Sequence, residues 1–266
     1  VFLLLLVGCP LDPAGLEVED AWVLGANPTL DVLFVVDDSN SMGAPQAGLA
    51  SIAPGITAGL TAGGMDWQVG VVTTDMAIAA RRGRLVGPVI HAADANGASL
   101  LSGQLRPGVT GSQMEQGLAS AWAAVTPPLL THENQGLLRP GARLAVVVLS
   151  DEDDCSDEGS LAGNEPSDCV SFPGMLVPIA EYAERLRSIV AVPEDVAVHA
   201  LVETGLTAEF EGCAGNNVGA RYVELARSLG GAVLPHCLDG ATMTAELVAQ
   251  LSDRRRVVLS IIGGDE

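Results

Sequence analysis

Lysine is absent from the sequence, and the 13 basic residues, all arginine, stand against 33 acidic residues. The formal net charge at pH 7 is −20. Nucleic acids and anionic lipid surfaces are bound by clustered positive charge, which this chain lacks, so both are excluded as direct partners on grounds of charge. With 48% hydrophobic and 17% charged residues, the 266-residue chain is long enough for one large globular domain.

The common signatures of enzyme sites are also missing. The sequence contains no H-E-x-x-H, no G-x-S-x-G, no phosphate-binding loop and no G-x-G-x-x-G. An aspartate nucleophile for phosphoryl transfer would call for D-x-D at Asp37, where Ser39 takes the second position. The histidines are scattered along the chain at His91, His132, His199 and His236. We therefore predict that the protein is not an enzyme, and a hydrolase is the weaker alternative.

The first cysteine follows a short apolar segment. Leu6-Val7-Gly8-Cys9 resembles the lipobox of bacterial lipoproteins, in which a lipidated cysteine becomes the mature N-terminus. We predict that residues 1–9 end a lipoprotein signal and that residues 10–28, which lack periodicity, form a tether. A lipid on Cys9 would place the protein in the bacterial envelope, and Pro10 after it favours the outer membrane. An ordinary secretory signal followed by a free cysteine remains the alternative.

The other four cysteines are an even number, as an oxidising compartment favours. None lies in the close C-x-x-C spacing of most zinc sites. Four cysteines allow three pairings, and we favour the two pairs that are near in sequence, Cys155–Cys169 and Cys213–Cys237.

Apolar strand patterns alternate with helical patterns from residue 29 to residue 264. Leu49, Ile52, Ile56 and Leu60 have helical spacing, and further helices are predicted at 112–124, 176–189, 218–229 and 241–251. The strand-like segments 67–75 and 84–92 are joined too closely for a helical crossover, so we expect them to be antiparallel. The pattern predicts an α/β domain with a doubly wound, mostly parallel sheet, one antiparallel edge strand and helices on both faces.

A buried strand ends abruptly in polar residues at Asp37-Asp38-Ser39-Asn40-Ser41. In open α/β sheets, ligands bind beyond the carboxyl ends of the strands, so these side chains lie where a site is expected. Their pattern, D-x-S-x-S, resembles the first element of the metal-ion-dependent adhesion site of von Willebrand factor type A domains.

The resemblance to this family runs over nearly the whole predicted domain and implies further metal ligands. The family supplies a threonine from a loop before a central helix, where this sequence offers Thr110 and Ser112. Thr110 matches by residue type and Ser112 by its distance from the helix, so either could be the ligand. The family also supplies an aspartate after the next central strand, where Asp151 stands.

These side chains suit a hard cation. Mg²⁺ prefers octahedral oxygen ligands, and Mn²⁺ or Ca²⁺ could take the same site. Neutral hydroxyl ligands would leave the ion electrophilic, with one position open for a carboxylate from a protein or surface partner. The resemblance thus implies a metal-dependent adhesion domain. The alternatives are a structural envelope protein that a metal merely stabilises, and residues that only cap a helix and a turn.

The segment 151–174 forms a long polar insertion that carries Cys155 and Cys169. Its acidic residues do not match an EF-hand loop, which needs glycine and glutamate at set positions. We expect them to form a solvated loop: Glu152, Asp153, Asp154, Asp157 and Glu158.

Overall fold

The computed structural model describes residues 21–22, 28–161, 166–204, 218–253 and 257–258. It divides into a large compact unit, Asn27–Asp253, and a second unit formed by the two ends of the chain. In that second unit the strands β1 (Ala21–Trp22) and β8 (Val257–Val258) pair antiparallel. Val257–Val258 therefore belongs to a two-stranded sheet and not to the six-stranded one. Cys9 and the rest of the predicted signal lie outside the described residues.

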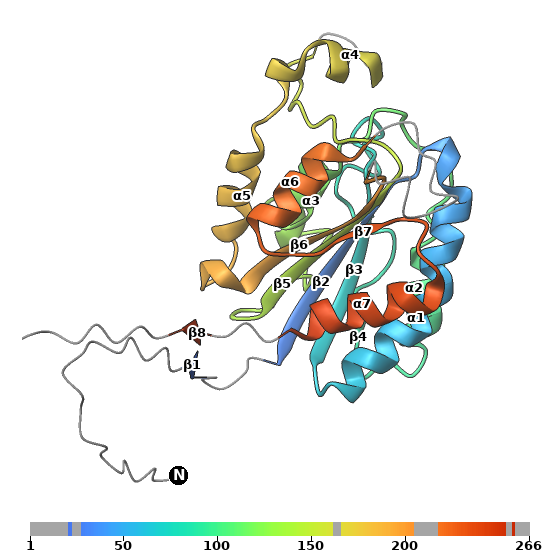
Figure 1. Cartoon of the computed structure of the whole chain (residues 1–266), viewed down its shortest axis with the longest axis vertical. Helices are drawn as coiled ribbons and strands as arrows, with labels where there is room; N and C mark the ends of the chain where they lie inside the picture. The colour runs from blue at the N-terminus through green and yellow to red at the C-terminus, as the bar shows by residue number, and fades with distance from the viewer. Residues whose placement is uncertain (1–20, 23–27, 162–165, 205–217, 254–256, 259–266) are drawn as a thin grey trace, which may run out of the picture. The chain divides into compact units, whose positions relative to one another are not determined.

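The large unit is built on a six-stranded sheet with the order β4-β3-β2-β5-β6-β7. All neighbouring strands are parallel except β4, which pairs antiparallel with β3 at one edge (Figure 1). The predicted doubly wound sheet with one antiparallel edge strand is thus confirmed. Its strands are β2 (Thr29–Val36), β3 (Asp66–Thr73), β4 (Ile90–His91), β5 (Arg143–Ser150), β6 (Val196–Val202) and β7 (Val233–Pro235).

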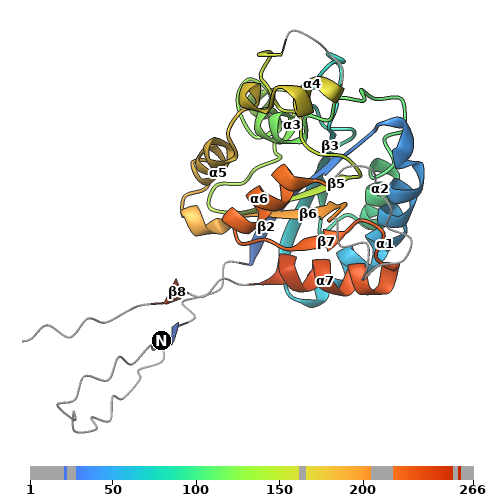
Figure 2. The same cartoon turned by 45° about the horizontal axis from the view of Figure 1, so that its top comes forward.

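Helices cover both faces of this sheet (Figures 1 and 2). On one face lie α1 (Gly43–Ala62), α2 (Gly97–Gln104) and α7 (Gly240–Ser252). On the other lie α3 (Gly117–Ala124), α5 (Ile179–Arg187) and α6 (Ala220–Ser228). Shorter elements are α4 (Pro166–Ser171) and the 3-10 turns η1 (Asn40–Met42), η2 (Leu129–Thr131), η3 (Pro173–Met175) and η4 (Pro193–Asp195).

Strand β2 shows why the sheet takes two helical layers. Its apolar residues alternate between the faces, because successive side chains on a strand point in opposite directions. Phe34 packs in the core beneath α1, whereas Leu33 and Val35 pack in the core beneath α3. A strand that is apolar on both sides can be buried only between two layers, which is typical of parallel sheets.

Within the described residues, no helix is both long enough and apolar enough to cross a membrane.

Candidate functional site

Three neighbouring parallel strands, β3, β2 and β5, have their carboxyl ends side by side at one end of the sheet. The Asp37 backbone N–H donates a 2.9 Å hydrogen bond to the Leu149 carbonyl, which joins the ends of β2 and β5. The Thr74 N–H donates a 3.2 Å bond to the Val36 carbonyl, which joins β3 to β2. The loops that follow these strands therefore converge on the same place, although they are far apart in the sequence.

Asp37 is fully buried at this end of the sheet. One carboxylate oxygen accepts a 2.8 Å hydrogen bond from the Ser39 N–H, and the other accepts a 2.6 Å bond from the Ser150 hydroxyl. Burial raises the pKa of Asp37 to about 7, although these hydrogen bonds act to lower it. Neighbouring Asp151 adds to the increase through charge repulsion. Among the described residues, no cationic side chain forms an ion pair with this buried carboxyl.

The two serines of the D-x-S-x-S pattern connect Asp37 to Asp151. The hydroxyls of Ser39 and Ser41 lie 3.2 Å apart, and the Ser41 hydroxyl donates a 3.1 Å hydrogen bond to the Asp151 carboxylate. Ser39 and Ser41 flank the start of η1, so the tight turn holds both hydroxyls on one side. Four of the predicted ligands therefore form one chain of contacts, although Asp151 lies 110 residues beyond Ser41.

The hydroxyls of Thr110 and Ser112 form hydrogen bonds with residues outside this chain of contacts. The Thr110 hydroxyl accepts a 3.1 Å hydrogen bond from Arg81. The Ser112 hydroxyl accepts a 3.0 Å bond from the Met114 N–H, and its own N–H donates to Asp75. No contact in the described structure links either hydroxyl to Asp37, Ser39, Ser41 or Asp151.

Arg81 connects the loop that carries Thr110 to two buried acids. Its guanidinium forms ion pairs with the buried carboxylates of Asp38 and Asp75, the latter at 3.2 Å. Burial raises the pKa of Asp38 to about 6, against the lowering effect of Arg81. The Gly111 N–H donates a 2.7 Å bond to the Asp38 carbonyl. The loop is thus fixed against Asp38, on the Arg81 side of the strand end.

The oxygen atoms fit a divalent cation. Neighbouring ligands of an octahedral ion with bonds of 2.0–2.1 Å lie about 3 Å apart, close to the Ser39–Ser41 separation of 3.2 Å. The donors are carboxylates and hydroxyls, which Mg²⁺ prefers. In the described part of the chain, no three His, Cys, Asp or Glu side chains converge as in a typical metal site. A site here would therefore depend on the serine hydroxyls.

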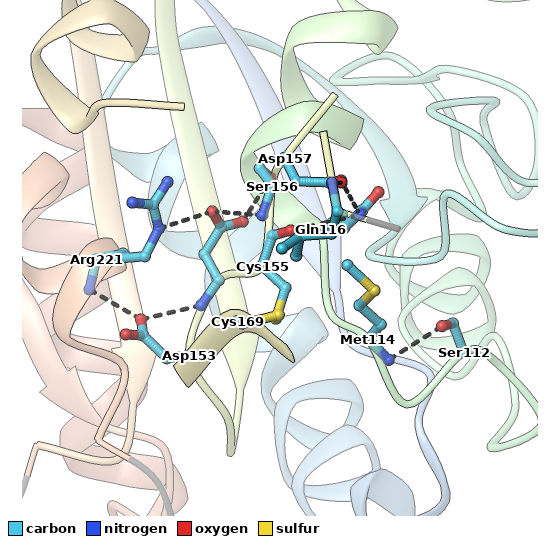
Figure 3. The surroundings of a disulfide bond; sticks show 11 residues. Ser112, Met114, Gln116, Asp153, Cys155, Ser156, Asp157, Cys169 and Arg221 are labelled. Atoms are coloured by element: carbon cyan, nitrogen blue, oxygen red, sulfur yellow. Dashed lines mark hydrogen bonds and ion pairs between the residues drawn. A yellow bond between two sulfur atoms is a disulfide. The ribbon is translucent and has the colours of Figure 1, made fainter. Parts of the chain in front are cut away.

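The acidic insertion forms the expected solvated loop only in part. Glu158 is exposed, as expected, but the expectation fails for the buried acids of the insertion. Asp154 and Asp157 are buried, and Asp153 accepts a hydrogen bond from the Arg221 N–H (Figure 3). Asp154 accepts from the Leu118 N–H at 3.0 Å, and Ser156 accepts from the Ala119 N–H at 2.9 Å. The expectation fails because a helix start leaves free N–H groups, and acids and hydroxyls in the insertion satisfy those of α3.

The first predicted disulfide, Cys155–Cys169, is present. Figure 3 shows the two cysteines near Met114. Both are buried in a small apolar cluster with Met114 and Leu176. Of the second predicted pair, Cys237 is disulfide-bonded and Cys213 lies outside the described residues.

Sequence reasoning missed Glu115, two residues before α3. Its side chain is 1% exposed, and its Oε1 atom has no hydrogen-bond partner in the described part of the chain. Burial, repulsion from Asp37 and the adjacent Glu152 carboxyl raise the pKa of Glu115 to about 10. Glu115 lies only three residues after Ser112, but the family pattern has a hydroxyl in this loop and so does not indicate an acid.

Comparison with known proteins supports the fold and goes no further. No protein family and no curated protein match the sequence. Among solved structures, proximal thread matrix protein 1 from the mussel byssus, crystal form 2, is similar with a TM-score of 0.50 and 14% identity. The match covers 88% of this chain and 49% of that one, so this chain spans about half the length of the mussel protein. At this identity the likeness concerns the fold alone.

Proposed function

We propose that this protein is a von Willebrand factor type A domain that binds a partner through a divalent metal ion. The observation that carries the proposal is the contact chain from Asp37 through Ser39 and Ser41 to Asp151. It gathers hydroxyl and carboxylate oxygens at the carboxyl ends of β2 and β5, where open α/β sheets bind ligands.

The neutral and the charged residues of the site would bind the ion in different ways. Ser39 and Ser41 would offer neutral hydroxyl oxygens to the ion, while Asp37 and Asp151 would bind it directly or through water. Mg²⁺ is the first choice of ion, and Mn²⁺ or Ca²⁺ are substitutes. One open coordination position would then accept a carboxylate from a protein or surface ligand.

The overall charge makes the ion essential for such a partner. At a net charge of −20, the protein repels acidic groups over distances of about a Debye length, roughly 8 Å in physiological salt. Only a local positive charge can reverse this at the site. Chelation should therefore abolish binding of an acidic partner instead of merely weakening it.

The cellular setting of the proposal comes from the sequence. A lipid on Cys9 would anchor the domain in the bacterial envelope. Pro10, which follows this cysteine, favours the outer membrane. The disulfide Cys155–Cys169 agrees with an oxidising compartment.

Partner capture tests the proposal. Immobilised protein would be exposed to solubilised envelope proteins and surface polymers, first with Mg²⁺ and then with a chelator. The same capture would be run with Asp151→Asn, which keeps the side-chain shape but removes a charged ligand. Glu194→Gln is the matched control, because it removes the same charge from an exposed residue at the opposite, amino end of β6. We expect capture by wild type and Glu194→Gln only with Mg²⁺, and none by Asp151→Asn.

The alternative is a metal that only stabilises the fold. It draws support from the complete burial of Asp37 and its hydrogen bond to Ser150 of β5, which tie this acid to the sheet itself. On this alternative, chelation would lower the unfolding temperature markedly while every capture experiment stayed negative. Equal capture with and without metal would contradict both candidate functions.

A further inference from the structure

Glu115 is a buried acid that has no cationic partner among the described residues. Its side chain is 1% exposed, its Oε1 atom makes no hydrogen bond, and it takes part in none of the ion pairs of the described chain. Buried carboxyl groups are almost always paired or bound to a metal, because leaving water is costly for the charged form. A group of this kind therefore calls for a specific reason.

The neighbours of Glu115 are themselves acids. Burial and the charges of Asp37 and Glu152 raise the pKa of Glu115. The segment lies near the strand end that carries Asp37, because the Gln116 N–H donates to the Thr74 carbonyl and the Thr74 N–H donates to the Val36 carbonyl. Glu152 directly follows Asp151. The charges of Asp37 and Glu152 both act on Glu115, and a cation bound beside Glu115 would relieve this repulsion.

The backbone around Glu115 is held from two sides. The Glu115 carbonyl accepts a 2.6 Å hydrogen bond from the Cys155 N–H, and the Gln116 N–H donates a 3.1 Å bond to the Thr74 carbonyl at the end of β3. Gln116 also donates through its side chain to Asp157 at 2.7 Å (Figure 3). These bonds fix the backbone at Glu115 between a strand end and the insertion.

We propose that Glu115 is a ligand of the divalent ion and takes the place for which the sequence had suggested Thr110 or Ser112. The inference rests on the proposed function, since it concerns the same ion. It deepens that function, because a carboxylate holds a divalent ion more strongly than a hydroxyl does. The ion should then stay bound in the absence of any partner.

Binding of Mn²⁺ alone to the full-length protein tests this inference. Free Mn²⁺ gives an electron paramagnetic resonance signal that is lost on binding, so titration yields a dissociation constant without any partner or activity. We expect Glu115→Gln to raise that constant by at least ~10-fold, because loss of even an outer-shell partner of a metal ligand typically costs about 10- to 100-fold in affinity. Thr110→Ala and Ser112→Ala should leave it within about twofold of wild type.

Glu152→Gln is the matched control, because it removes the same charge from a neighbouring acid that we do not assign as a ligand. If Glu115→Gln and Glu152→Gln weaken Mn²⁺ binding equally, Glu115 acts only through its charge and the inference is overturned. Circular dichroism of the metal-free variants checks folding. Glu115→Ala offers a second substitution, with the same expected loss, if the glutamine variant does not fold.

The outcomes separate the inference from the proposed function. Binding that Asp151→Asn abolishes and Glu115→Gln leaves intact overturns the inference alone. If Glu115→Gln abolishes Mn²⁺ binding but a chelator does not change partner capture, the inference is supported and the proposed adhesion is contradicted. Wild-type protein that binds no Mn²⁺ overturns both.

Discussion

The disulfide Cys155–Cys169 should stabilise both the fold and the metal site, and the double variant Cys155→Ala/Cys169→Ala tests this. The bond joins cysteines separated by 14 residues in the sequence. Closing a loop of about 15 residues reduces the entropy of the unfolded chain by an amount worth about 3 kcal/mol at 25 °C. Variants are preferable to a reductant, because Cys237 is also disulfide-bonded and would be reduced as well.

The expected change in unfolding temperature follows from the size of the Asn27–Asp253 unit. At roughly 2.1 cal/mol/K per residue, the unfolding entropy of such a unit is about 0.5 kcal/mol/K. A loss of about 3 kcal/mol therefore lowers the midpoint by about 6 °C, which differential scanning calorimetry detects easily. Leu161→Ala serves as the control, because Leu161 packs against the same small cluster without forming the cross-link.

The same variant should weaken the metal site, since the Cys155 N–H donates to the Glu115 carbonyl. Without the cross-link the insertion holds this carbonyl less firmly, so we expect a several-fold weaker Mn²⁺ affinity. An unfolding midpoint within about 1 °C of wild type would refute the loop-closure reasoning. An unchanged Mn²⁺ affinity in a destabilised variant would show that the insertion does not position Glu115.

Three further predictions concern pH, packing and anchoring. The folded-state pKa values of Asp37 (about 7) and Glu115 (about 10) lie above their usual values, so the metal-free protein should lose stability as the pH rises from 6 to 9, and saturating Mg²⁺ should flatten this profile in thermal melts. Gly231→Ala should prevent folding or lower the yield of folded protein severely, as judged by circular dichroism, because its Cβ would lie 1.8 Å from the Val198 carbonyl oxygen. Cys9→Ala should release the protein from membranes on fractionation, and an unchanged membrane-bound pool would contradict the lipid anchor.

The sequence predicts the sheet because local pattern and burial agree there. Apolar runs on both sides of β2 require two helical layers, and Leu49, Ile52, Ile56 and Leu60 are all buried on α1, as their spacing predicts. The short link between the segments 67–75 and 84–92 likewise required an antiparallel pair, although regular pairing is limited to Ile90 and His91.

The site was predictable only where its residues follow a strand directly. Asp37 and Asp151 come immediately after β2 and β5, so the sheet itself places them. The loop before α3 has no such constraint, and its position depends on the ion pairs of Arg81 with Asp38 and Asp75. Arg81 comes from a different segment of the chain, and no local pattern shows which acid it will meet.

The position of Glu115 beside the start of α3 explains why it would need a cation at all. A helix N-terminus normally stabilises a nearby carboxylate through its free N–H groups and its dipole. At α3 two of these N–H groups are already used, because Leu118 donates to Asp154 and Ala119 donates to Ser156. Asp154 is also paired with Arg221 at 3.1 Å, which offsets its charge. The insertion thus satisfies the helix and leaves Glu115 with acidic neighbours, so a bound divalent ion is the charge that would balance it. Substituting Asp154 by asparagine should therefore destabilise α3 without restoring a partner to Glu115, and the Mn²⁺ affinity should fall far less than in Glu115→Gln.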